Sequence, residues 1–185
     1  MCRSWSAGAS VLGLVLAACG GGDGKAAGDA GGEGSSTVQV PTGGGTATTI
    51  HLVIGGGPHA GTYDVKSSDV TCTYGFAGKG SWGNQYSVTG KKPNEFSSLQ
   101  LIVPDTKDAA DGTDVFLMTA AFGELMQPGY SEHTINTTKD NKQGSGTITV
   151  DDKEKTGKVT FKGKAGDGTT LEGTIDCHQL MRSDG

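Results

Sequence analysis

The residue types best suited to catalysis or metal binding are sparse in this chain. Its four histidines are His51, His59, His133 and His178. No two of them stand in H-x-H or H-E-x-x-H spacing, the arrangements that present imidazoles together to zinc. Unless tertiary folding brings them together, they are isolated strand-end or surface residues. We therefore predict no metal centre and no cofactor.

A run of four carboxylates shares some features with a calcium loop. Asp105, Asp108, Asp111 and Asp114 recur at every third residue. An EF-hand loop takes its first ligands from alternate residues instead. A polar loop between two strands explains the run more simply, so calcium binding is only a secondary expectation.

The chain shows neither a nucleophile motif nor a nucleic-acid-binding composition. Gly80-Ser81-Trp82-Gly83 does not match the G-x-S-x-G elbow of serine hydrolases. The net charge is -5, from 15 Lys+Arg against 20 Asp+Glu, whereas affinity for phosphate backbones comes from clustered cations. The sequence predicts a protein that is not an enzyme and does not bind nucleic acid.

The N-terminus has the pattern of an export signal. Arg3 precedes an apolar run at residues 7–18, which is shorter than the roughly 20 residues of a transmembrane helix. The run ends in Leu16-Ala17-Ala18-Cys19, which resembles the lipobox of bacterial lipoproteins. The resemblance implies that residues 1–18 are a signal peptide and that Cys19 becomes the acylated N-terminus. An ordinary secretory signal followed by a chance cysteine is the alternative.

A lipid anchor at Cys19 implies that the membrane is a partner and the bacterial cell envelope the location. Two or three acyl chains hold a protein stably, because each buried methylene contributes about 0.8 kcal/mol. In a Gram-negative cell, Gly20 after the cysteine is compatible with sorting to the outer membrane. In any other bacterium, the expected location is the outer face of the plasma membrane.

The segment after the anchor is predicted to be a disordered tether. The tether covers residues 19–46, and 11 of the 27 residues at positions 20–46 are Gly. Such a segment buries too little apolar surface to offset the entropy lost on ordering. Such a coil spans roughly 30 Å. The tether therefore allows the domain that follows it to extend away from the membrane.

The remaining residues, 47–185, have the length of one domain. Runs of alternating apolar and polar residues are separated by Gly, Asp and Pro turns, and none shows helical periodicity. This pattern predicts an all-β fold, an antiparallel β-sandwich or barrel of about 8–10 short strands. The run at 114–122 is apolar on both faces, which predicts a strand covered on both sides. The last three runs, from residue 146 to 177, predict a meander.

Two cysteines remain in the domain, Cys72 and Cys177, both within predicted strands. Export permits a disulfide, and closing a loop of about 105 residues stabilises a fold by up to nearly 5 kcal/mol in the chain-entropy treatment. We predict a Cys72–Cys177 disulfide. Two buried free thiols and a metal-binding pair are the alternatives.

An aromatic, Gly-punctuated segment lies between residues 73 and 90. Phe76, Trp82 and Tyr86 would form an exposed platform for a carbohydrate or a protein if they faced solvent. The alternative is that Trp82 and Tyr86 fill the core while the glycines shape a loop.

A polar tether precedes a β-domain with one cysteine early, in Val70-Thr71-Cys72, and one late, in Thr174-Ile175-Asp176-Cys177. This layout is similar to that of small mycobacterial lipoprotein antigens, which implies surface exposure and no particular site residue. We expect a non-catalytic binding or interaction module whose ligand is an envelope protein, a glycan or a lipid. A carrier of lipid or another small apolar ligand is the second hypothesis, and an envelope hydrolase or metalloenzyme the third. A filled core favours the first, a hollow lumen the second, and converging ionisable residues the third.

Overall fold

The structure is a computed structural model that describes residues 47–138 and 142–183. These residues belong to one compact unit. The predicted signal peptide at 1–18, the predicted acylation site Cys19 and the predicted tether at 19–46 lie outside the described residues. Within the described part of the chain, no helix is long and apolar enough to cross a membrane.

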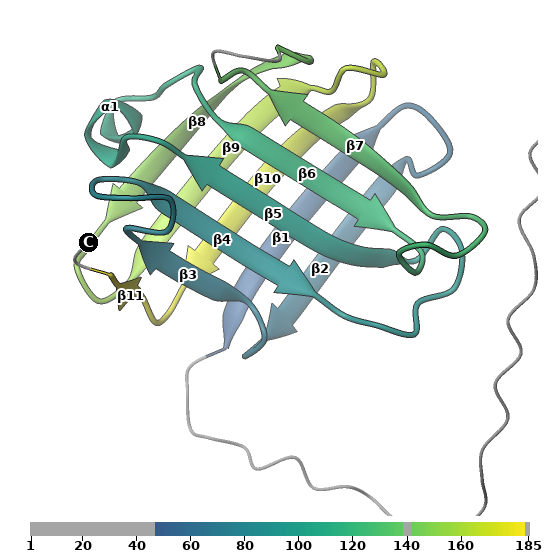
Figure 1. Ribbon diagram of the computed structural model, residues 1–185, viewed down its shortest axis with the longest axis horizontal. Helices are drawn as coiled ribbons and strands as arrows, with labels where there is room; N and C mark the ends of the chain where they lie inside the picture. The colour runs from purple at the N-terminus through teal and green to yellow at the C-terminus, as the bar shows by residue number, and fades with distance from the viewer. Residues whose placement is uncertain (1–46, 139–141, 184–185) are drawn as a thin grey trace, which may run out of the picture. The chain divides into compact units, whose positions relative to one another are not determined.

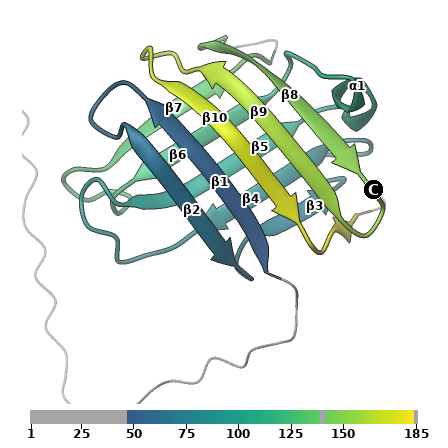
Figure 2. The same cartoon turned by 180° about the vertical axis from the view of Figure 1, so that it is seen from behind.

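Two sheets stack face to face as a β-sandwich (Figures 1 and 2). The five-stranded sheet, in front in Figure 2, contains β1 (Thr48–Gly55), β2 (Gly61–Ser67), β8 (Ser145–Asp152), β9 (Gly157–Lys164) and β10 (Thr170–Cys177). The six-stranded sheet, in front in Figure 1, contains β3 (Thr71–Tyr74), β4 (Trp82–Ser87), β5 (Phe96–Val103), β6 (Leu117–Phe122), β7 (Ser131–Asn136) and β11 (Met181–Arg182). The predicted antiparallel sandwich is confirmed, with only the short β11 pairing in parallel, to β3.

The strand order brings the two ends of the domain together. The five-stranded sheet runs β2-β1-β10-β9-β8, so the first strand pairs with the last long one. Ile50, Leu52 and Ile54 on β1 point inward and are each at most 2% exposed, as their alternation predicts. The meander is also confirmed, because β8, β9 and β10 pair in sequence.

The outer faces of the two sheets differ in charge. On the five-stranded sheet, opposite charges face each other across neighbouring strands, as in Lys158 with Asp176 and Lys162 with Glu172. Such exposed pairs each stabilise a fold by less than about 1 kcal/mol. The outward positions of β4, β5 and β6 carry no charge. The two faces therefore present different chemistry to solvent.

The apolar run at 114–122 is less regular than its sequence suggests. The strand β6 begins only at Leu117, because Val115 and Phe116 donate their backbone N–H groups to the hydroxyls of Thr113 and Thr137. Side-chain bonds of this kind compete with the sheet ladder. Val115 is 40% exposed, so the expectation of cover on both sides is wrong at this end of the run.

Sequence periodicity missed one short helix, α1 (Thr106–Ala110). The Asp105 carboxylate caps it by accepting from the backbone N–H of Lys107 at 2.8 Å, as N-terminal aspartates commonly do. Five residues are too few for an apolar stripe to show a helical period. Asp105 is thus a structural residue.

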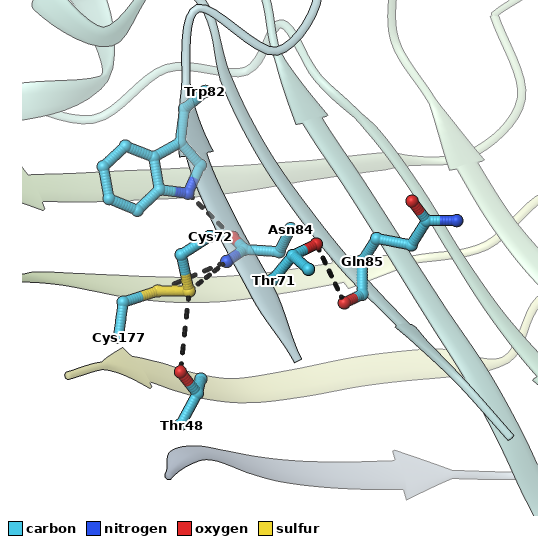
Figure 3. Close-up of a disulfide and its surroundings, with 7 residues drawn as sticks. All are labelled: Thr48, Thr71, Cys72, Trp82, Asn84, Gln85 and Cys177. Carbon is cyan, nitrogen blue, oxygen red and sulfur yellow. Dashed lines mark hydrogen bonds between the residues drawn. A yellow bond between two sulfur atoms is a disulfide. The ribbon is translucent and has the colours of Figure 1, made fainter. Parts of the chain in front are cut away.

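The predicted disulfide is present and joins the two sheets. Cys72 of β3 and Cys177 of β10 are bonded, with their Cα atoms 6.1 Å apart. Figure 3 shows Asn84 beside them, its amide donating to both sulfur atoms, at 3.0 and 3.3 Å, while its oxygen accepts from the Trp82 indole at 2.7 Å. The fully buried indole rests on Gly157, where an added Cβ would lie 2.4 Å from the ring. This cluster fixes the spacing of the sheets at one end.

Candidate functional site

The structure divides the three predicted platform aromatics. Trp82 is fully buried and Tyr86 is 7% exposed, as the alternative of core aromatics predicts, so neither belongs to an exposed platform. Phe76 is 37% exposed and lies over Gly83, where an added Cβ would lie 2.3 Å from its ring. One half-exposed ring does not make a platform.

The four carboxylates of the acidic run are not grouped in the structure. Asp105 is used as a helix cap, and Asp108, Asp111 and Asp114 are exposed. Among residues 47–138 and 142–183, no three histidines, cysteines or carboxylates are grouped so that they could hold a metal ion. The structure therefore does not bring these four aspartates together.

Two of the four histidines stay apart on the surface, and two converge. His51 is exposed and bonds to Asp64 of the neighbouring strand β2, and His178 is exposed after β10. His59, in the β1–β2 loop, meets His133 on β7, and both are buried, at 3% and 4% exposed. We call His59 and His133 the histidine pair.

The histidine pair lies at the end of the sandwich where four connections meet, on the right in Figure 1. These are the β1–β2, β4–β5 and β6–β7 loops and the β9–β10 turn. The His59 ring stacks on Phe122 with centroids 4.0 Å apart, and Tyr63 donates its hydroxyl to the His59 carbonyl at 2.9 Å. Packing thus holds the ring in one orientation.

A chain of hydrogen bonds runs through the pair. His133 Nδ1 lies 2.6 Å from the Asp167 carboxylate in the β9–β10 turn, and His133 Nε2 lies 2.9 Å from His59 Nδ1. His59 Nε2 lies 3.2 Å from the Asn94 side-chain oxygen in the β4–β5 loop and 3.3 Å from the Ser131 hydroxyl. The chain therefore connects the β9–β10 turn, the strand β7, the β1–β2 loop and the β4–β5 loop.

The partners constrain the hydrogen-bonding roles of the ring nitrogens. The Asp167 carboxylate only accepts, so His133 Nδ1 donates to it. One proton lies between His133 Nε2 and His59 Nδ1. At His59 Nε2, the Asn94 amide and the Ser131 hydroxyl can each donate or accept.

Asp167 is held in its charged form. Burial raises its pKa, but hydrogen bonds from Thr169, through its backbone N–H and its side chain, and from His133 outweigh burial and lower it. A lowered carboxyl pKa contributes stability that is present above the unfolded-state value and is lost as the pH falls through the folded-state value. Asp167 therefore stays a carboxylate throughout the neutral range.

The sequence does not reveal this convergence, because the two histidines are 74 residues apart. One signal was available, since His133 alternates in phase with Ile135 on a predicted strand, which places it on the core side. Nothing in the sequence indicated that the β1–β2 loop would fold back over β7.

The same end carries the most exposed apolar side chains of the described residues. Leu125 and Met126, in the β6–β7 loop, are 64% and 92% exposed. We call these two residues the apolar tip. Met126 has φ 65°, a left-handed conformation that costs a non-glycine residue roughly 1–2 kcal/mol. Strain of this kind persists where the surrounding structure imposes it, and it clusters at functional sites.

Hydrogen bonds hold the apolar tip in place. The Glu124 carboxylate accepts from the backbone N–H groups of Gly90 and Lys91 in the β4–β5 loop. The N–H of Gly123 donates to the Glu95 carbonyl in the same loop at 2.8 Å. The β4–β5 loop thus clamps the β6–β7 loop, and its Asn94 is also the last link of the histidine chain. The β4–β5 loop thus joins the loop that carries the tip to the histidine pair.

Comparison with known proteins gives no relative to compare with this site. No protein-family model matches the chain, and no curated protein and no solved structure matches it significantly. The case for function therefore rests on the residues and their geometry.

Proposed function

We propose that the protein is a lipid-anchored interaction module of the bacterial cell envelope, which binds a protein partner through its apolar tip without catalysis. The observation that carries the proposal is the exposure of Leu125 and Met126 on a strained, hydrogen-bonded loop. Flexible, polarisable methionines are common at binding surfaces. A preorganised loop also loses little conformational entropy when it binds.

The interior supports a binding module more than a carrier. Trp82, Phe116, Phe122 and Phe161 are fully buried, and aliphatic side chains from both sheets pack around them. A carrier for a lipid needs an apolar lumen instead. We therefore propose that the ligand binds at the surface of the domain.

Converging ionisable residues such as the histidine pair would favour a hydrolase, but the surroundings of this pair do not suit a serine nucleophile. A serine nucleophile needs a neighbouring imidazole nitrogen that is free to take its proton. The Ser131 hydroxyl lies 3.3 Å from His59 Nε2, but the Asn94 side-chain amide lies 3.2 Å from the same nitrogen and competes for it. The pair is therefore proposed to be structural, with a role outside catalysis.

Partner binding is tested by cross-linking from the tip. A photoreactive amino acid at Met126, in protein made in its own host, is expected to give one reproducible adduct, identified by mass spectrometry. Excess purified wild-type protein should compete for the adduct. The Leu125→Ser/Met126→Ser protein should compete about tenfold less well or worse, because truncating a central apolar contact typically costs more than 1 kcal/mol.

Two matched proteins control this experiment. The same photoreactive group at Thr160, which is exposed on the outer face of β9, should give no such adduct. Met126→Gly keeps the left-handed backbone and should be at least as stable as the wild type, yet compete poorly. Equal competition by the wild-type and the double-serine proteins would show that the tip does not bind the partner.

The anchor is tested at Cys19. In the host, wild-type protein is expected to partition into detergent and to carry acyl chains by intact-mass measurement, because two or more chains anchor stably. Cys19→Ser should leave the protein unacylated and move it to the aqueous phase. A matched Thr42→Ser change should have no effect, and an aqueous, unmodified wild-type protein would refute the lipid anchor.

A further inference from the structure

Three of the four sheet edges are covered by backbone hydrogen bonds. The outer strands are β2 and β8 in one sheet and β7 and β3 in the other, where the two-residue β11 pairs with β3. Beside β8, Thr113 and Ile148 exchange two backbone hydrogen bonds of 2.9 Å. Beside β7, the Gly166 N–H donates to the Thr134 carbonyl at 3.1 Å. The fourth edge is the strand β2.

The strand β2 leaves the backbone groups of its outer side unpaired. It is the outermost strand of the front sheet in Figure 2, and its seven residues pair with β1 on one side only. On the other side, none of them makes a backbone–backbone hydrogen bond within residues 47–138 and 142–183. Such a row of free N–H and C=O groups is a template for another strand.

We propose that β2 is a docking edge for an extended peptide segment of a partner protein, which joins the five-stranded sheet as a sixth, antiparallel strand. An extended backbone fits this edge because it presents N–H and C=O groups in the same alternation. The antiparallel direction follows the rest of the sandwich, in which every strand except β11 pairs in that way, and it is the slightly more stable ladder. This site goes beyond the proposed function, which places a partner at the apolar tip.

The strand lacks the features that usually protect an open edge. Those features are proline, a bulge and charged side chains that point inward. β2 contains no proline, and its register with β1 runs through seven consecutive pairs without a bulge. Its two charged residues, Asp64 and Lys66, are exposed on the outer face, where they leave the path of an added strand free.

The side chains of β2 indicate which peptide would fit. Tyr63 and Val65 point inward and are only partly buried against the core, so apolar residues opposite them would complete their cover. On the outer face, Lys66 lies opposite the uncharged Thr49 of β1, whereas two lysines of β9 face carboxylates on β10. The matching segment therefore alternates apolar residues with a carboxylate opposite Lys66 and a cation opposite Asp64.

The test uses a synthetic peptide, Thr-Val-Glu-Val-Lys-Val-Thr, and nuclear magnetic resonance on the mature protein. In the antiparallel register, its glutamate lies opposite Lys66, its lysine opposite Asp64 and its central valine opposite Val65. Saturating peptide is expected to slow amide exchange about tenfold at alternate residues of β2, those whose N–H groups point away from β1, because each gains a hydrogen bond. The amides of β9 should not change.

Backbone methylation of the peptide tests the hydrogen bonds directly. Only alternate residues of an added strand turn their N–H groups toward β2. N-methylation of one alternate set should therefore weaken binding about tenfold or more, while methylation of the other set should leave most of it. Equal affinity of the two methylated peptides would contradict strand addition.

A charge exchange tests the register. The wild-type protein should prefer the original peptide about fivefold over one in which glutamate and lysine are exchanged, because opposite charges across strands stabilise a pair and like charges destabilise it. Asp64→Lys/Lys66→Glu should reverse this preference. The matched pair Lys158→Glu/Asp176→Lys, on the outer face of the same sheet, should leave it unchanged.

The outcomes separate this inference from the proposed function. Absence of saturable binding, or a charge preference that Asp64→Lys/Lys66→Glu does not reverse, overturns the docking edge. A protein that dimerises without peptide and already protects the outward amides of β2 would assign the edge to a second copy and also overturn the proposal. Cross-linking from position 126 decides the apolar tip independently of these results.

Discussion

Replacing both cysteines of the disulfide, as Cys72→Ala/Cys177→Ala, is expected to lower the free energy of unfolding by about 3–5 kcal/mol. The bond closes a sequence separation of 105 residues, and a loop of that size contributes nearly 5 kcal/mol in the chain-entropy treatment. The buried Asn84 amide would also lose its two sulfur acceptors, which adds a desolvation cost. Denaturation in guanidinium chloride, followed by circular dichroism, measures the change.

A neighbouring substitution controls for changes to β3 itself. Thr73→Ala alters the next residue of the strand, on the opposite face, and should change stability by less than about 0.5 kcal/mol. If the double-alanine protein loses less than about 1 kcal/mol, the disulfide does not hold the sheets together as described. A loss near the upper figure would bring a typical domain, stable by 5–15 kcal/mol, close to unfolding at body temperature.

Trp82→Ala is expected to destabilise the domain by about 3–5 kcal/mol, the range for deleting a large buried side chain. The indole is fully buried, rests on Gly157 and donates to the Asn84 oxygen at 2.7 Å. Its removal leaves a cavity beside the disulfide and an unpaired buried acceptor. Denaturant unfolding with a far-ultraviolet readout measures the loss.

Two further variants separate the cavity from the hydrogen bond. Trp82→Phe keeps much of the apolar volume but removes the donor, so it should cost about 1–3 kcal/mol. Gln85→Ala, three residues along on the exposed face of β4, should be nearly neutral. A Trp82→Ala protein as stable as the Gln85→Ala protein would contradict this account of the core.

Much of the fold follows from short-range pattern. Ile50, Leu52 and Ile54 alternate on β1, and their periodicity alone predicts both the strand and its buried face. The ends of elements were less predictable. The strand β6 starts at Leu117 because hydroxyls of Thr113 and Thr137 capture the preceding N–H groups, and Thr137 is more than 20 residues away.

The site was the least predictable part. Trp82 and Tyr86 have the chemistry of a binding platform, but whether an aromatic faces the core or solvent depends on which sheet covers the strand. The apolar tip also gives no local signal, because Leu125 and Met126 would look equally suited to a core. Their exposure results from the clamp by Glu124, which bonds to a loop more than 30 residues earlier.

The sequence by itself determined the strand content, an antiparallel sandwich or barrel, and the cysteine pairing, because alternation and a single pair of domain cysteines leave few options. Only the tertiary structure decided for the sandwich, brought His59 and His133 into contact, and placed Leu125 and Met126 at the same end. The physical reason is range: alternation acts between residues two apart, whereas hydrogen bonds between loops depend on strand order and register. The histidines are 74 residues apart, so no local sequence pattern indicates their contact.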